Sequence, residues 1–484
     1  MPISLALALT LILAGAAAAG LVAMALSQLG AVNLATTRPT TTEVLEIVKI
    51  SLAVVAGLGG VVALVVAYRK QRVTEAGESR EQAKLFNERF TTAASQLGND
   101  SPAVRLAGVH AMAALADDWE GGRQMCIDVL CAYLRMPPSP EPDAGTDQTE
   151  RTTWLAMGEV RSTIWRLIAT HLKADARTPW HGADLDFTGV TITNDIDFSN
   201  TVFPSGIIQF NGAEFSGSEV SFTGAQFSGG TVWFGGAKFS GGTVRFGGAK
   251  FSGGEVWFDE AKFSGSTVWF GGAKFSGGEV WFGEAKFSGG EVWFGGAEFS
   301  GGTVRFSEAE FSGGEVSFTG AKFSGGEVWF GEAKFSGGEV GFTDAKFSEG
   351  AIWFGGAEFS GGTVRFTEAK FSGGEVWFGG AEFSGGTVRF TEAKFSESAI
   401  WFGGAEFSGG EVWFDGVEFS GGEVWFDGAK FSGGEVGFTG AKFSGGAVGF
   451  DTVADWSHPP ADWPAQAPGL TLPPAPAPAP GPDS

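Results

Sequence analysis

Side chains that could do nucleophilic, acid–base or metal chemistry are scarce in this chain and poorly spaced for it. The 484 residues include four histidines and two cysteines. No His and no Cys occur between Val190 and Phe450, over half of the sequence. Neither a Ser–His pair nor a metal-binding cluster can therefore form within that stretch. Its serines recur at one turn position without a neighbouring base.

The histidines, cysteines and glycine-rich turns of the chain are also poor candidates for catalysis or ligand binding. His110 and His171 lie in a helical segment, where we interpret them as packed or surface residues. Cys126 and Cys131 are too few for a disulfide framework or a four-ligand zinc site, and we expect reduced, buried thiols. Repeated SGG turns lack the Lys and Ser or Thr of a phosphate loop and the Asp of a calcium β-roll. We therefore expect no enzymatic activity, no cofactor and no bound metal.

The charge balance narrows the class of partner. The formal net charge is -23, from 32 Lys and Arg against 55 Asp and Glu. Affinity for nucleic acid depends on basic side chains that neutralise phosphates, so direct nucleic-acid binding is not expected. An acidic chain suits basic partners, or simply solubility.

The elements that must position any site come from a repeat. Phe215, Phe227 and Phe239 begin a series with a 12-residue period that continues to Phe443, and a second series runs from Phe222 to Phe450. A Val, replaced twice by Ile, lies two residues before each Phe of the second series. Both V-x-F and A-x-F have strand periodicity, which places the two apolar residues on one face. Because GG and SGG segments supply tight turns and an isolated unit cannot bury its Phe, we predict a β-solenoid of stacked coils.

The repeat resembles the pentapeptide-repeat family. The resemblance rests on ADLDF at 183–187, then GAEFSG, GAQFSG and many copies of GAKFSG, over roughly residues 183–450. It implies a right-handed, four-sided parallel β-helix with about five residues on each face. Each unit here is 5 + 7 residues instead of two fives, which departs from the family pattern.

The residue between Val and Phe points outward, and its identity bears on the size of the coil. Taken in alternate units, this position forms a Trp-rich column and a mixed sister column. Two interpretations remain open: a 24-residue coil whose two columns lie on different faces, or a 12-residue coil in a gene that grew by 24-residue duplications. We favour 24. The Trp-rich column is the candidate interaction face: Trp233, Trp257, Trp281, Trp329, Trp353, Trp377, Trp401 and Trp425.

A column of indoles with an interspersed Arg can stabilise a solenoid by stacking and cation–π contacts, or bind a flat partner surface. Because the position also tolerates Ser and Gly, we favour the stabilising role. Lys of A-K-F and Glu of G-G-E-V recur together, so we also expect ion pairs between them across coils, each worth about 0 to 1 kcal/mol.

The N-terminal region predicts a membrane hairpin. Ile3–Leu29 is apolar for longer than the ~20 residues that cross a bilayer, and a second span covers Ile50–Tyr68. Arg69, Lys70 and Arg72 follow directly, which favours both termini and the bulk of the chain in the cytoplasm. A cleaved signal peptide is the competing interpretation of the first span, although it lacks a basic start.

Four regions result: a transmembrane helical hairpin (1–72), a cytoplasmic α-helical module that caps the solenoid (73–180), the pentapeptide-like β-helix (181–450), and a C-terminal cap with a Pro-rich, disordered tail (451–484). Within the module, Ser101 and Pro102 predict a helix start, and VRLAGVHAMAALADD resembles a helix of a HEAT-type repeat. Trp456 and Trp463 are candidates to cover the last coil.

The sequence therefore predicts a non-enzymatic, membrane-anchored scaffold or protein-interaction module, with an unidentified protein partner. A second class is a DNA-mimicking inhibitor of a nucleic-acid enzyme such as a topoisomerase, because some pentapeptide-repeat proteins resemble duplex DNA in shape and charge. The anchor, the regular Lys residues and the exposed Trp residues argue against it. A third interpretation, with the topology inverted, is an extracellular rod.

Overall fold

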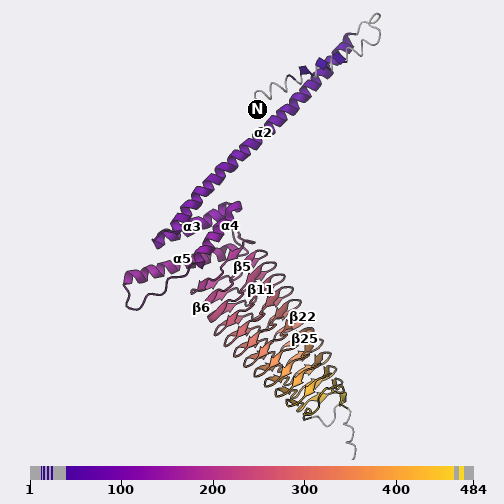
Figure 1. The fold of residues 1–484 in the computed structure, drawn as a ribbon. Helices are drawn as coiled ribbons and strands as arrows, with labels where there is room; N and C mark the ends of the chain where they lie inside the picture. Colours follow the sequence, from indigo (N-terminus) through magenta and orange to yellow (C-terminus); the bar gives the residue numbers. More distant parts are fainter. Residues whose placement is uncertain are drawn as a thin grey trace, which may run out of the picture. The chain divides into compact units, whose positions relative to one another are not determined.

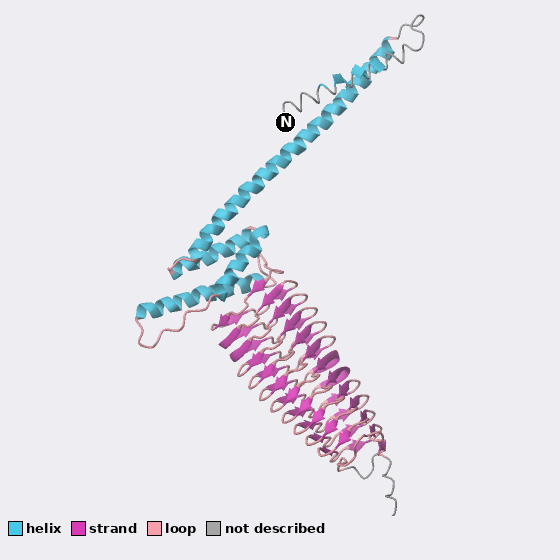
Figure 2. Ribbon diagram, in the orientation of Figure 1, coloured by secondary structure: helices cyan, strands magenta, loops and turns pink. Residues whose placement is uncertain are grey.

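A computed structural model describes residues 40–462 and 468–473, together with seven isolated positions between 12 and 24. The chain divides into two compact units, Met1–Arg89 and Phe90–Ser484. Figure 1 shows the elements in chain order, and Figure 2 shows that the first part is helical and that the later part is built of short strands joined by turns. Each unit is described by itself.

The first unit consists mainly of α2 (Thr41–Leu97), which crosses the boundary between the units. The predicted span Ile50–Tyr68 lies inside this helix, and its described apolar side chains are mostly exposed. Within the described residues, one helix, Val48–Leu97, is long and apolar enough to cross a membrane by length and composition. Two spans are not supported, and the first predicted span, Ile3–Leu29, lies largely outside the described residues.

The helix α2 does not end at Arg72, where we placed the end of the hairpin. It runs on to Leu97 because the segment 73–97 contains no Pro and a single Gly, Gly77, so nothing local stops the helix. Arg72 donates a hydrogen bond from Nε to the Tyr68 hydroxyl, 3.0 Å away and one turn earlier. The basic cluster Arg69, Lys70 and Arg72 therefore lies on the same uninterrupted helix as the apolar segment.

Three helices and a short 3₁₀ turn precede the solenoid in the second unit: α3 (Pro102–Asp118), η1 (Glu120–Gly122), α4 (Arg123–Arg135) and α5 (Gln148–Leu172). As predicted, α3 begins directly after Ser101, with Pro102 in its first turn. Trp165 of α5 packs on Phe187 and Phe198 of the first coil, with ring centroids 4.5 and 6.1 Å away. The helices therefore cover Phe rings that would otherwise meet water.

The solenoid has four ladders of parallel strands, named here in the order in which the chain visits them within a coil. Figures 1 and 2 show the short strands stacked from coil to coil. The first ladder contains β4 (Val202–Phe203), β7 (Gln226–Phe227), β10 (Lys250–Phe251), β14 (Lys274–Phe275), β18 (Glu298–Phe299), β22 (Lys322–Trp329), β25 (Lys346–Trp353), β28 (Lys370–Phe371), β32 (Lys394–Phe395), β36 (Glu418–Phe419) and β40 (Lys442–Phe443). The second ladder contains β1 (Leu185–Asp186), β5 (Ile207–Gln209), β8 (Thr231–Trp233), β11 (Glu255–Trp257), β15 (Glu279–Trp281), β19 (Thr303–Arg305), β22, β25, β29 (Glu375–Trp377), β33 (Ala399–Trp401), β37 (Glu423–Trp425), β41 (Ala447–Gly449) and β42 (Leu470–Thr471).

The third ladder contains β2 (Thr191–Ile192), β6 (Glu214–Ser221), β9 (Lys238–Arg245), β12 (Lys262–Phe263), β16 (Lys286–Phe287), β20 (Glu310–Phe311), β23 (Lys334–Phe335), β26 (Glu358–Phe359), β30 (Glu382–Phe383), β34 (Glu406–Phe407) and β38 (Lys430–Phe431). The fourth ladder contains β3 (Ile196–Asp197), β6, β9, β13 (Thr267–Trp269), β17 (Glu291–Trp293), β21 (Glu315–Ser317), β24 (Glu339–Gly341), β27 (Thr363–Arg365), β31 (Thr387–Arg389), β35 (Glu411–Trp413) and β39 (Glu435–Gly437).

The register settles the size of the coil. Val256 pairs with Val280 and Phe251 pairs with Phe275, so each residue meets its equivalent two repeat units further on. The second ladder has one strand in each of twelve successive coils from β1 to β41, so the solenoid makes about 12 turns. The 24-residue coil that we favoured is confirmed, and each coil has four faces.

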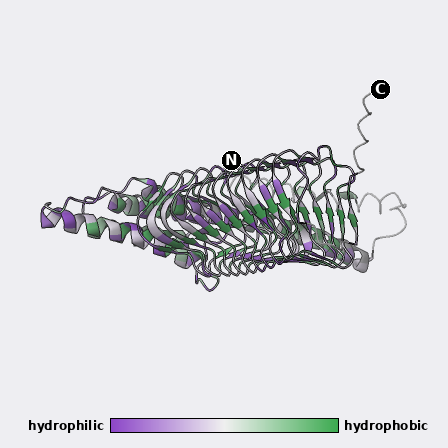
Figure 3. Cartoon of the chain, turned by 90° about the horizontal axis from the view of Figure 1, so that it is seen from below, coloured by the Kyte–Doolittle hydropathy of each residue, from purple (hydrophilic) through white to green (hydrophobic). Residues whose placement is uncertain are grey.

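Stacked Phe rings fill the interior. Phe258 lies 4.7 Å from Phe282 at an interplanar angle of 4°, and its edge meets Phe270 at 6.5 Å and 85°. Every Phe, Val and Ala of the regular repeat is buried, in agreement with the predicted alternation. Figure 3 shows the resulting rows of apolar residues, which repeat from coil to coil. Each such ring pair adds about 0.5–1.5 kcal/mol beyond its area burial.

The last coil is covered by the segment that follows Phe450. β42 pairs with β41, and the Trp456 ring meets Phe431 and Phe450 edge-on at 5.5 and 5.3 Å. The part of the prediction that concerns Trp456 is thus confirmed. Trp463 and the Pro-rich end lie outside the described residues.

Candidate interaction face

The Trp column forms along the second ladder, where the 24-residue register places every member beside the next. Trp257 pairs with Trp281 in the strand register, and their rings stack at 4.6 Å and 6°. The same stacking joins Trp329, Trp353 and Trp377, at 5.0 and 4.9 Å. The remaining pairs, Trp233–Trp257, Trp377–Trp401 and Trp401–Trp425, lie 5.4, 5.2 and 6.3 Å apart. The structure therefore brings all eight predicted residues into one column.

Arg305 occupies the one position of this column that lacks a Trp. Its guanidinium carbon lies 4.1 Å from the centre of the Trp281 ring and 5.9 Å from that of Trp329. A guanidinium is flat and cationic, so it continues the stack in place of an indole. The column is consequently unbroken from Trp233 to Trp425.

The indole N–H groups have a local partner that the sequence analysis did not anticipate. Nε1 of Trp257, Trp329, Trp377 and Trp425 donates to the carboxylate two residues earlier, over 2.9 to 3.1 Å. Where that Glu is replaced by Ala, as before Trp353 and Trp401, the buried Nε1 has no partner within the described residues. The buried Nε1 of Trp281 also has no partner within the described residues, although Glu279 lies two residues before it. The E-V-W and A-I-W variants of the repeat could have indicated which indoles have a Glu partner, because residues two apart in a strand lie on the same side.

Stacking leaves the edges of the indoles, rather than their faces, toward solvent. Trp233, at the start of the column, is 38% exposed, and the other seven are half-buried. The Trp column thus presents a narrow apolar strip beside a row of carboxylates. That arrangement is compatible both with internal stabilisation and with contact to a partner.

The outward column of the fourth ladder is mixed. Trp269 stacks on Trp293 at 5.8 Å. Trp413 covers Gly437 so closely that a β-carbon there would lie 2.4 Å from the indole. The outward arginines of this column do not stack on rings within the described residues, and two of them pair with a Glu of the preceding coil instead.

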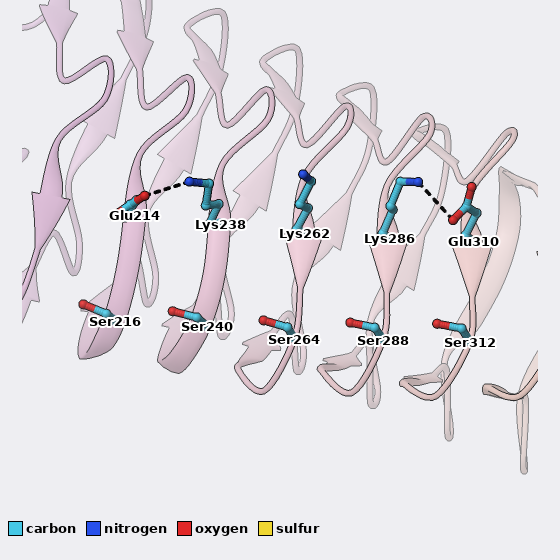
Figure 4. A pocket seen from close by; sticks show the side chains of 10 residues that line it. All are labelled: Glu214, Ser216, Lys238, Ser240, Lys262, Ser264, Lys286, Ser288, Glu310 and Ser312. Carbon is cyan, nitrogen blue, oxygen red and sulfur yellow. Dashed lines mark hydrogen bonds and ion pairs between the residues drawn. The ribbon is translucent and has the colours of Figure 1, made fainter.

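Lys and Glu pair across coils, but not with the partners that we predicted. Lys238 meets Glu214 at 2.8 Å and Lys286 meets Glu310 at 3.1 Å, so the pairs join A-K-F to A-E-F positions of adjacent coils. The Glu of G-G-E-V belongs to another ladder, and among the described residues no ion pair joins it to these lysines. Figure 4 shows these pairs above a row of serine hydroxyls in a groove of about 390 Å³. The lining residues are Glu214, Ser216, Lys238, Ser240, Lys262, Ser264, Lys286, Ser288, Glu310 and Ser312.

The residues with possible chemistry lie in the helices. Burial raises the pKa of Cys126 to about 11 and that of Cys131 to about 12, which leaves both as thiols at neutral pH. Nε2 of His171 lies 3.2 Å from Asp117, its ring stacks on Trp180, and Trp180 donates to the same carboxylate. Across the part of the chain that the structure describes, no group of three His, Cys, Asp or Glu residues is placed to hold a metal ion.

A four-sided parallel β-solenoid preceded by helices is therefore the class of protein that this chain forms. A family model described as pentapeptide repeats, in nine copies, matches residues 210–262, 246–298 and 385–430, and this match supports a pentapeptide-repeat protein. No curated protein and no solved structure matches the chain. The resemblance seen in GAEFSG and GAKFSG thus agrees with the family match, while the 24-residue register comes from the structure.

Proposed function

We propose that this protein is a non-enzymatic, membrane-anchored scaffold whose solenoid binds a protein partner. The observation that carries the proposal is the Trp column, an unbroken strip of stacked aromatic edges on a rigid support. A scaffold benefits from rigidity, because a preformed surface loses little conformational entropy when it binds. Trp and Arg, the two residue types in the column, are also the ones enriched at binding hot spots.

The anchor in this proposal is the apolar segment of α2. Leu52, Val61 and Leu64 are among its exposed apolar side chains, as expected of a helix that meets lipid. The basic cluster that follows favours a cytoplasmic solenoid. Reporter fusions after Arg72 and after Phe450 test this placement, and export of either reporter would overturn it.

A DNA-mimicking inhibitor is the alternative, and the net acidity favours it. The pairing of Lys238 with Glu214, and its repeats along the ladders, neutralises part of the charge that such mimicry would require. A supercoiling assay with the purified chain separates the two functions. Inhibition of a topoisomerase would favour mimicry over the scaffold.

The scaffold is tested by proximity labelling with full-length protein and with a Trp377→Ser, Trp401→Ser double variant. The matched control changes Trp269 and Trp293 of the fourth ladder to Ser. Loss of a specific labelled membrane or envelope protein in the first variant alone, with unchanged melting temperature, supports a recognition face. A lower melting temperature with the same labelled proteins would mean that the Trp column only stabilises the solenoid.

A further inference from the structure

The outward charges of the third ladder form a pattern of their own. Ten successive strands of this ladder, β6 to β38, each present one Lys or Glu beside the buried Phe. In chain order the ten residues are Glu214, Lys238, Lys262, Lys286, Glu310, Lys334, Glu358, Glu382, Glu406 and Lys430. Read from the other end, the row has the opposite charge at every position. The matching row of the first ladder, with seven Lys, two Glu and one Gln, does not have this property.

Contacts within the chain use only part of this charged row. Six of the ten residues form three ion pairs between adjacent coils. The other four are exposed and make no side-chain hydrogen bond or ion pair within the described residues: Lys262, Lys334, Glu358 and Glu382. Figure 4 shows the first five side chains of the row on one side of successive strands, with Lys262 between the two pairs. Two cations and two anions on this face are therefore free to meet a partner.

A second copy of the chain supplies the matching charges. We propose that the third ladder binds the third ladder of a second copy, antiparallel, about a two-fold axis between Glu310 and Lys334. In such an interface every contact between two different residues occurs twice. The five kinds of contact along the row then all join opposite charges: Glu214–Lys430, Lys238–Glu406, Lys262–Glu382, Lys286–Glu358 and Glu310–Lys334. Lys262 and Glu382, which have no ion pair within one copy, become partners.

The order of charges also selects one orientation and one register. Parallel copies at the same level would place every Lys of the row against a Lys and every Glu against a Glu. In the antiparallel orientation, a shift of one coil in either direction would bring like charges together at five of nine contacts. Because like charges placed against each other cost affinity, the two-fold arrangement is favoured over both alternatives.

The face is large enough for a dimer. At ~4.8 Å per coil the ten positions span about 43 Å, and about five residues across a face give a width of about 16 Å. Contact over this face would cover roughly 700 Å² on each copy, close to the ~800 Å² per partner of a stable interface. The turn that follows each of the ten strands contains only Ser and Gly, so no long side chain separates the copies along that edge.

The other edge of the face contributes one unfavourable contact. The corner before each strand has a Glu in four coils, at Glu260, Glu284, Glu308 and Glu332. The two-fold axis lies across the row, so it brings this corner against the same corner of the second copy. Glu260 and Glu284 then lie opposite glycines, and only Glu308 meets Glu332. The opposite charges along the row outnumber this contact.

Sedimentation of the full chain in detergent at low salt tests the proposal. We expect a dimer whose dissociation constant rises roughly tenfold or more in Lys262→Glu and in Glu382→Lys, because each change creates two like-charge contacts. The double variant with both changes should recover the parent affinity. Neither change should lower the melting temperature, because Lys262 lies between two lysines of its row and Glu382 between two glutamates. The matched control is Lys370→Glu, at an exposed Lys of the first ladder that has no ion pair within the described residues, and it should leave the dimer intact.

A disulfide cross-link tests the register directly. The Lys262→Cys, Glu382→Cys double variant should form a covalent dimer on mild oxidation, whereas Lys262→Cys alone should not. Within one copy these two positions are five coils apart, about 24 Å, which is too far for a disulfide. The native Cys126 and Cys131 are buried and do not compete.

Four results would overturn the proposal. One is a monomer at low salt, and another is a dimer that both charge inversions leave unchanged, since another surface would then join the copies. Equal weakening by Lys262→Glu and Lys370→Glu would indicate a general effect of charge and not this face. Failure of the double variant to restore the dimer would show that Lys262 and Glu382 do not meet.

Discussion

Stacking of coils depends on glycine at the second Gly of each SGG turn, and Gly302→Ala tests that dependence. A β-carbon at Gly302 would lie 2.6 Å from the Gly278 carbonyl oxygen and 2.9 Å from the Phe275 β-carbon, both in the preceding coil. Neither atom can rotate away. The two hydrogen bonds that join the coils at this point, from Gly302 to Phe275 and from Thr303 to Gly278, would lengthen as well.

The magnitude follows from these contacts. Overpacking costs about 1–3 kcal/mol, and the two hydrogen bonds, which lengthen without breaking, together add about 1 kcal/mol. We therefore expect Gly302→Ala to destabilise the local structure by roughly 2–4 kcal/mol. The control is Gly295→Ala in the same coil, where the nearest atom to a β-carbon is 3.8 Å away. That change should be neutral or stabilise by about 0.4–1 kcal/mol, because alanine restricts the unfolded chain.

Hydrogen exchange followed by mass spectrometry reads the effect locally. Peptides that cover residues 275–306 should exchange roughly 30- to 1000-fold faster in Gly302→Ala than in the parent, since each ~1.4 kcal/mol is a factor of ten. Urea unfolding of the full chain in detergent provides the global comparison. Equal exchange in the Gly302→Ala and Gly295→Ala variants would refute the reasoning, because it would show that the coils separate without loss of stability.

Four further predictions concern the core, the charged ladders and the thiols. Phe306→Ala should lower the free energy of unfolding by about 3–5 kcal/mol in urea titrations, because the buried ring stacks at 4.7 and 4.9 Å on its two neighbours; a loss below about 1 kcal/mol would contradict the close packing. Glu315→Gln should stabilise the protein at pH 7, with an advantage that shrinks as the pH falls, since burial and like charges raise the pKa of this carboxyl in the folded state. Glu298→Gln should destabilise the protein at pH 7, because hydrogen bonds from two flanking lysines lower the pKa of Glu298 in the folded state. The stability that these hydrogen bonds contribute is present above the unfolded pKa and is lost on acidification. Melting curves at several pH values check the direction of the change in both variants. Cys126 and Cys131 should resist iodoacetamide at pH 8 until the protein is denatured, because burial raises both pKa values, and rapid alkylation of the native chain would show that this helix opens.

The interior could be predicted because it depends on local geometry. In a strand, side chains two residues apart share a face, so the V-x-F and A-x-F patterns identify Val, Ala and Phe as buried without knowledge of their neighbours. The alternation of Trp and Arg between successive units also indicated a 24-residue coil, which the pairing of Val256 with Val280 confirms. The column of eight Trp residues followed from the same periodicity.

The partners of the outward residues could not be predicted in this way. We expected Lys of A-K-F to pair with Glu of G-G-E-V, whereas Lys238 pairs with Glu214 of A-E-F, and Arg365 pairs with Glu339. The continuation of α2 beyond Arg72 was also missed, since a change in composition does not end a helix without a terminating residue. These outcomes depend on which ladder a residue occupies and how far its side chain reaches.

The sequence by itself determined which side chains lie inside this solenoid, because strand periodicity is a property of the local backbone. Only the tertiary structure decided which outward residues meet, since stacking joins positions a full coil apart that no local pattern relates. Glu315 illustrates the difference. In the sequence it is one Glu of many equivalent repeats. In the structure its ladder neighbours Glu291 and Glu339 accept hydrogen bonds from Trp293 and Arg365, whereas the side chain of Glu315 accepts none within the described residues.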